Sequence, residues 1–303
     1  MNGILVINKD QGMTSFDVIS FLRKRTGVKR IGHSGTLDPM ATGVLPIFIG
    51  SATRVIEFSG ITGDPEAKIY RCGMKLGLET DTLDIWGTTL ASTSEFSYEK
   101  DEIISVLKGF EGTGVQKPPM YSAIKIDGRK LYEYARKGIE VDEDKIKERE
   151  IYIKHIDVNN IDLDSNEIYF DVVCSKGVYI RTLCADIGRK LGCGAVMSSL
   201  IRLKSDSFFI EQAISFESIN DDKESFPALL PLDTPLGWMP KVELENDMSR
   251  RFSLGQKLEF HGEKIGKKRV YCRGSFIGIG VVTDNGLLAP KKIIVNNDSD
   301  MEV

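Results

Sequence analysis

The sequence is poor in the residues that usually build metal centres and disulfide frameworks. It has three histidines, far apart in the chain, and five cysteines with no Cys-x-x-Cys pair. An odd number of cysteines with this spacing argues against a disulfide framework and against a zinc ribbon. We therefore expect neither a metal nor a cofactor, and we expect reduced and mostly buried thiols at five positions: Cys72, Cys174, Cys184, Cys193 and Cys272.

Long apolar runs are also missing. No stretch reaches the roughly 18 apolar residues that a membrane-spanning helix needs. The first ten residues lack the basic leader and the small-residue cleavage site of a signal peptide. The composition, 41% hydrophobic and 28% charged, is that of an ordinary globular protein. We expect a cytoplasmic protein with no membrane association.

The chain carries no excess of positive charge. Its 40 Lys and Arg residues face 44 Asp and Glu residues, for a net charge of −4, which is not typical of a nucleic-acid binder. Five basic residues nevertheless crowd into residues 23–30. Such a cluster can bind phosphates on an otherwise acidic protein, although a solvated helix face is the simpler interpretation of the cluster alone.

The most unusual stretch is residues 32–46, Gly-His-Ser-Gly-Thr-Leu-Asp-Pro-Met-Ala-Thr-Gly-Val-Leu-Pro. Three glycines and two prolines disfavour both helix and strand, so the stretch is predicted to be a long shaped loop. Asp38 lies between Leu37 and Pro39, and the proline restricts its backbone to extended conformations. A carboxylate so constrained is a candidate catalytic group, whereas an isolated Asp-Pro would more often be an Asx turn.

Apolar periodicity predicts the surrounding elements. Thr14 and Asp17 are spaced as a capping box for a helix that ends in the basic cluster, and Gly192 is a C-terminal cap for a helix that begins near Gly177. Further helices are expected at 51–58, 103–107 and 128–138, and strands at 3–8, 45–49, 67–74, 151–158 and 167–174.

At 303 residues the chain is longer than a usual single domain. Pro231, Pro235, Pro240 and Gly237 indicate a linker. Short β-rich runs follow, with Asp284-Asn285-Gly286 as a hairpin turn. We predict a large domain over 1–230 and a small β-rich domain over 231–303.

The loop at 32–46 resembles the catalytic motif of the TruB family of pseudouridine synthases, Gly-His-Ser/Thr-Gly-x-Leu-Asp-Pro-x-Ala-x-Gly-x-Leu-Pro. Separate stretches at 68–70, 80–87, 116–138, 177–188 and 199–202 match the family as well. The resemblance implies an α+β pseudouridine synthase fold, with a mixed and mainly antiparallel central sheet flanked by helices. It also implies a small PUA-like β-barrel domain at 231–303 and an insertion at about 116–149 that closes over RNA like a thumb.

The resemblance assigns roles to individual residues. It makes Asp38 the nucleophile and pairs Arg181 with it. It places Tyr70 in a stack on the target base, as a candidate for moving the C5 proton. The nucleotide-contacting positions that it implies are His33 at the flipped-out nucleotide, Tyr179 beneath the site and Leu200 in the uracil pocket.

Two departures from the family pattern stand out. Lys9-Asp10-Gln11-Gly12 replaces Lys-Pro-x-Gly, and Asp206 occupies a later glycine position.

Basic side chains beside aromatic ones suit RNA, because cations meet phosphates and rings stack on bases. The predicted RNA contacts outside the catalytic loop are Lys9, Arg30, Lys125, Arg129 and Arg136.

The function implied is the isomerisation of uridine 55 in the T loop of tRNA, by a monomer whose partner is the T arm of tRNA and which needs no protein partner. One alternative is the related RNA-guided branch, which would lack the thumb at 116–138. Another is an RNA-binding or tRNA-folding protein without catalysis, and the folding activity could also accompany the enzymatic one. A carboxylate-based glycosidase is a distant third, because no second acid stands in comparable surroundings.

Overall fold

The computed structural model describes residues 1–60, 64, 66–221 and 226–294, and it is dominated by one large mixed sheet. The strand order is β14-β1-β3-β12-β4-β11-β10-β7, with β2 against β3 and β13 against β12. The pairs β1–β14 and β3–β12 are parallel and the others are antiparallel, which confirms the predicted sheet class. The strands are β1 (Gly3–Lys9), β2 (Ile31–His33), β3 (Thr42–Ile49), β4 (Lys68–Leu76), β7 (Gly112–Gln116), β10 (Arg149–Asp162), β11 (Glu167–Cys174), β12 (Ala195–Ser205), β13 (Phe208–Phe209) and β14 (Ile214–Ser215).

Three helices cover one face of this sheet: α1 (Ser15–Thr26), α2 (Lys100–Lys108) and α4 (Ile180–Leu191). The Thr14 hydroxyl accepts from the Asp17 amide at 3.1 Å, and the Asp17 carboxylate accepts from the Thr14 amide at 2.8 Å, so the predicted capping box is present. Gly192 ends α4 with a φ of 87°, as expected of a left-handed cap. None of the helices in the described residues is long and apolar enough to cross a membrane.

The continuous apolar run of β1 is explained by burial on both faces. Leu5 and Ile7 join the core beneath the helices, whereas Ile4 and Val6 point to a second cluster on the opposite face. A strand covered on both sides needs no polar alternation.

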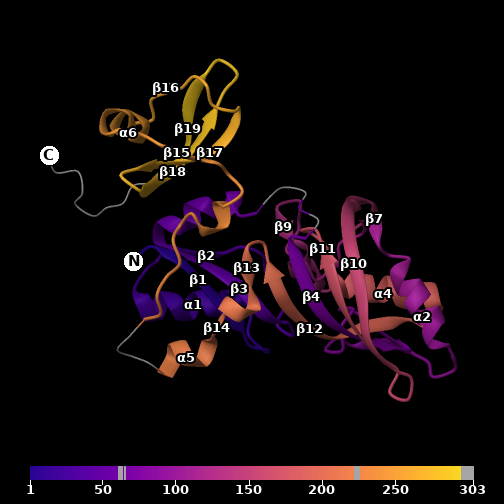
Figure 1. Cartoon of the computed structure of the whole chain (residues 1–303). Coiled ribbons are helices and arrows are strands. Elements are labelled where there is room, and N and C mark those ends of the chain that lie inside the picture. The colour runs from indigo at the N-terminus through magenta and orange to yellow at the C-terminus, as the bar shows by residue number, and fades with distance from the viewer. Residues whose placement is uncertain (61–63, 65, 222–225, 295–303) are drawn as a thin grey trace.

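The C-terminal part forms a curled five-stranded sheet in the order β15-β17-β18-β19-β16, a half-barrel that agrees with the predicted fold class. Figure 1 shows it above the end of the large sheet that carries β1, β2 and β3, with α2 and α4 at the other end. The second cluster joins the two parts, and the Trp238 indole donates to the carbonyl of Phe58 at 3.3 Å. The elements are β15 (Lys241–Glu243), α6 (Asn246–Ser253), β16 (Leu258–Glu259), β17 (Gly266–Cys272), β18 (Ser275–Val282) and β19 (Leu287–Ile293).

Two predicted helices are wrong in detail. Gly50–Phe58 is a 3-10 helix, labelled η1 here. Within 128–138 only α3 (Leu131–Ala135) is helical, because β8 (Lys125–Ile126) and β9 (Arg129–Lys130) form a hairpin. Its turn residues Asp127 and Gly128 have φ of 50° and 81°, the values that an Asp-Gly turn of type I′ requires, and this dipeptide was the overlooked signal.

Short elements complete the described chain. They are β5 (Leu78–Thr80), β6 (Thr89–Ser92), α5 (Phe216–Asp221) and three 3-10 helices at Glu143–Lys145, Ile210–Gln212 and Thr234–Leu236. All five cysteines are free thiols, four of them buried, as predicted.

Candidate active site

The Asp38 loop connects β2 to β3 and passes between the first turns of two helices. The Ser15 side chain, at the start of α1, accepts from the Leu37 amide at 2.9 Å and donates to the Leu37 carbonyl at 3.1 Å. Arg181, in the first turn of α4, meets Asp38 from the other side. Both helix N-termini favour negative charge near them, so the surroundings suit an ionised carboxylate.

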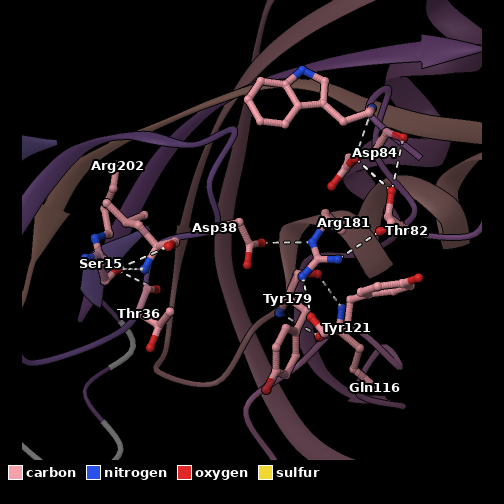
Figure 2. A network of polar contacts seen from close by, with 12 residues as sticks. Ser15, Thr36, Asp38, Thr82, Asp84, Gln116, Tyr121, Tyr179, Arg181 and Arg202 are labelled. Carbon is pink, nitrogen blue, oxygen red and sulfur yellow. Dashed lines mark hydrogen bonds and ion pairs between the residues drawn. The ribbon is translucent and has the colours of Figure 1, made fainter. Parts of the chain in front are cut away.

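Arg181 holds Asp38 with one hydrogen bond, from Nε to Oδ2 at 2.8 Å. Its other two nitrogens donate to the backbone carbonyls of Thr82 and Tyr121, each at 2.8 Å (Figure 2). The ion pair is therefore monodentate. Arg181 is 4% exposed, while the Asp38 side chain keeps 36% of its surface accessible, so the carboxylate is aimed and still reachable.

Arg202 fixes the loop from beneath and was not predicted as a site residue. This side chain on β12 is 1% exposed and donates to the carbonyls of Gly35, Thr36 and Val44 at 3.0, 3.4 and 2.8 Å. Three backbone acceptors on both sides of the loop are thus satisfied by a single guanidinium. The signal was available in the sequence, since Arg202 follows Leu200 at the two-residue spacing of one strand face.

Lys9 has a different place from the one predicted. It is 0% exposed, and its amine donates to the carbonyls of Asp10 and Met13 at 2.9 and 2.8 Å and reaches that of Pro39 at 3.5 Å. Burial lowers the pKa of Lys9 to about 8, against the opposing charge of Asp38. Lys9 therefore braces the turn after Asp38 from within, and with no exposed surface it is not placed to contact RNA as predicted.

Tyr70 on β4 and Leu200 on β12 are buried on neighbouring strands. Both belong to the core cluster that also contains Leu37, with exposures of 9% and 7%. Burial raises the pKa of Tyr70 above its ordinary value, against the opposing charge and hydrogen bond of Arg202. The phenol is consequently neutral at physiological pH.

His33 and Tyr179 flank the loop from two other elements. His33 ends β2, and burial, followed by the charge of Arg202, lowers the pKa of its imidazole, so the ring is neutral near pH 7. Tyr179 is the residue before α4, and Gln116 bonds both its amide (2.8 Å) and its carbonyl (3.0 Å). Gln116 was not predicted as a site residue, and it ties the thumb segment (residues 116–149) to the helix that carries Arg181.

Asp206 fits the glycine position that it occupies. Its φ is 56°, a left-handed conformation that glycine adopts without cost, and its carboxylate is buried between two lysines. The Lys68 amine lies 3.4 Å from it and donates to Ser205 at 2.7 Å, whereas the Lys176 amine lies 2.9 Å away. Burial lowers the pKa of Lys68 to about 8.

The other predicted basic contacts lie at the surface. Arg30 is exposed just before β2, Lys125 and Arg129 are exposed on the β8–β9 hairpin, and Arg136 follows α3. The Arg136 guanidinium lies 5.4 Å from the Tyr132 ring centre. Within the described residues no group of three or more His, Cys, Asp or Glu side chains is placed to hold a metal ion.

The arrangement combines a fixed and reachable carboxylate with a neutral buried phenol. A carboxylate of this kind can act as a nucleophile or stabilise positive charge.

Family models match most of the chain. Residues 23–180 match the N-terminal domain of the TruB family pseudouridylate synthases, and residues 181–237 and 240–294 match two C-terminal domains of the same family. The chain is 44% identical to tRNA pseudouridine synthase B of Alkaliphilus oremlandii, covering 93% of each. It is 41% identical to the protein of that name from Clostridium tetani, covering 97% of this chain and 100% of the relative.

Solved structures share the fold. A chain of the Cbf5–Nop10–Gar1 complex superposes with a TM-score of 0.72 at 24% identity, over 98% of this chain and 86% of that one. A chain of an H/ACA RNP bound to a substrate RNA containing 2′-deoxyuridine gives 0.71 at 23% identity, with the same coverage.

Proposed function

The chain belongs to the TruB family of pseudouridylate synthases, and we propose that it converts uridine 55 in the T loop of tRNA to pseudouridine with Asp38 as the nucleophile. It is an isomerase that acts on tRNA. The finer assignment is supported above all by one observation: a carboxylate that is about one-third exposed is held by Arg181 on a loop that buried side chains anchor.

The reaction breaks the bond between N1 and C1′, turns the detached uracil and forms a bond between C5 and C1′. The proton on C5 is lost and N1 gains one, so the product is an isomer and no redox step is needed. Asp38 attacks either C1′ or C6, and Arg181 fixes the direction from which the carboxylate approaches.

Tyr70 supports the proton transfer and the stacking of the base. Because burial raises its pKa, the phenol would act by hydrogen bonding to the base or by passing a proton on, and not as a phenolate. Leu200 gives the detached uracil an apolar surface that keeps water away.

The target uridine has to leave its stack to reach Asp38, which costs a few kcal/mol. The exposed basic side chains of the thumb segment and Arg30 are the proposed phosphate contacts that offset this cost. That no protein partner is needed and that the chain is a monomer remain predictions, as do cytoplasmic localisation and the boundary at residue 230; part of the small domain, 295–303, lies outside the described residues.

The test uses an unmodified tRNA transcript with wild-type protein and the Asp38→Asn variant. Pseudouridine is read at each position by carbodiimide labelling and primer extension. We expect wild type to modify uridine 55 and Asp38→Asn to bind the tRNA without modifying it. Modification at other uridines only would overturn the position, and an active Asp38→Asn variant would overturn the nucleophile. Binding without any modification would favour a tRNA-folding protein.

A further inference from the structure

Two neighbouring large apolar side chains stand exposed on the turn between β5 and β6. Ile85 is 45% exposed and Trp86 is 51% exposed. Trp86 is one of only two tryptophans in the chain, and the other, Trp238, lies partly buried at the joint with the C-terminal sheet. Adjacent exposed side chains of this size form a small apolar patch, which is a candidate binding surface.

The turn that carries Trp86 is firmly held. The Asp84 carboxylate accepts from the Trp86 amide at 3.0 Å and from the Thr82 hydroxyl at 2.8 Å. The Ile85 amide donates to the carbonyl of Met197 on β12 at 3.0 Å. Leu83 has a φ of 62°, a left-handed conformation that is strained for a leucine and that the surrounding bonds maintain. The indole therefore projects from a defined position.

The same turn is tied to the catalytic carboxylate. Arg181 donates one N–H to the Thr82 carbonyl and another to Asp38, both at 2.8 Å (Figure 2). Trp86 follows Thr82 by four positions in the chain, so their Cα atoms are at most about 14 Å apart. Trp86 thus lies within a few nucleotides' reach of the bond that reacts.

The charges of the turn limit which part of an RNA can bind at Trp86. Residues 78–92 contain three acids, Glu79, Asp81 and Asp84, and no lysine or arginine. Acids repel phosphates, so this turn is unsuited to the backbone of RNA. An uncharged base of any type can stack on an indole.

We propose that Trp86 is a stacking platform for a T-loop base beside the uridine that reacts. This inference rests on the proposed function, because the occupant is a base of the same tRNA. Stacking there would hold the opened loop while the target uridine lies at Asp38, and it would act on binding and positioning without touching the reacting atoms.

The direct test is fluorescence. In a Trp238→Phe, Asp38→Asn protein, Trp86 is the sole tryptophan and the tRNA stays unmodified. We expect unmodified tRNA to quench its emission and to protect it from acrylamide. If Trp238→Phe fails to fold, the same signal is the difference between Asp38→Asn proteins with and without Trp86→Phe. Emission that tRNA leaves unchanged overturns the proposal. Emission that instead falls with protein concentration, without tRNA, overturns it in favour of contact with a second copy.

Kinetics give the second test. We expect Trp86→Ala to raise KM for tRNA about tenfold and Trp86→Phe to restore it to within about threefold of wild type, because an aromatic ring keeps the stack. Leu90→Ala removes another exposed apolar side chain from the same hairpin, 68% exposed on β6, and should leave KM unchanged. Equal KM for Trp86→Ala and wild type overturns the stacking role, although the wild-type product at uridine 55 still supports the proposed function. Quenching of Trp86 emission by tRNA, combined with no pseudouridine at uridine 55 from wild-type protein, would support the stacking role and overturn the proposed function.

Discussion

The Asp38 site and the thumb segment differ in how far their basic side chains are buried and in what those side chains bind. At the site, the anchoring side chains Arg181, Arg202 and Lys9 are at most 4% exposed and donate mainly to backbone carbonyls. In the thumb segment, the basic side chains lie at the surface, and a typical tie is the Lys145–Asp127 ion pair, whose side chains are 53% and 67% exposed.

The difference follows from what each region is proposed to do. Chemistry at one atom requires groups that do not have to rearrange during the reaction, and buried donors with fixed acceptors supply this. Phosphate contacts act through charge over several ångströms and tolerate motion. Substitutions should therefore reduce kcat or stability at the site, and tRNA affinity in the thumb segment.

The largest effect is expected from Arg181→Lys. The single ammonium of lysine lacks the planar fork that reaches Asp38, Thr82 and Tyr121 from three nitrogens, so the carboxylate loses its fixed direction. Single-turnover assays should show the rate falling about 100-fold, with tRNA affinity within about twofold of wild type. A rate within about threefold of wild type would contradict a fixed direction for Asp38.

Arg202→Met should lower the free energy of unfolding by about 3 kcal/mol, because three carbonyls lose their donor at about 1 kcal/mol each. Urea unfolding measures the loss. The matched control is Arg71→Met on β4, where a surface ion pair with Asp171 is broken and less than about 1 kcal/mol should be lost. Similar losses in both variants would show that burial of the guanidinium contributes nothing.

The buried Lys68 should make the free energy of unfolding depend on pH. Burial lowers its pKa to about 8, below its ordinary value of 10.5, so the folded state holds this proton less tightly than the unfolded state. The destabilisation is complete below pH 8 and disappears towards pH 10.5. The difference in unfolding free energy between wild type and Lys68→Met should therefore rise with pH in that window, by about 1.4 kcal/mol per pH unit at most. The corresponding difference for Arg71→Met should stay flat.

The smallest effect is expected in the thumb segment. Arg129→Ala should weaken tRNA binding about fivefold, leave kcat unchanged and reduce the salt dependence of log Kd by about 0.7 to 0.9, the loss of one phosphate contact. Arg129→Lys keeps the charge and should bind nearly as wild type does. A fall in kcat for Arg129→Ala would show that the two regions are not separable.

Local chemistry explains which predictions succeeded. The Thr14 capping box, the Gly192 cap and the alternating strands depend on neighbouring residues, and each is present. The helix predicted over 128–138 is wrong at its start, because Asp127-Gly128 forms the turn of a hairpin that pairs Arg129–Lys130 with Lys125–Ile126. Lys9 was predicted as an RNA contact, and its burial among loop carbonyls is not visible in sequence.

The sequence by itself determined the family, the class of the sheet and the candidate carboxylate Asp38, because these depend on local pattern and on a long motif. Only the tertiary structure decided that Arg181 divides its donors among three segments, that Arg202 lies under the loop, and that Trp86 is tied to Asp38 through one guanidinium. These contacts join residues separated by about 60 to 170 positions, and their geometry is fixed by the packing of β4, β12 and α4 into one core.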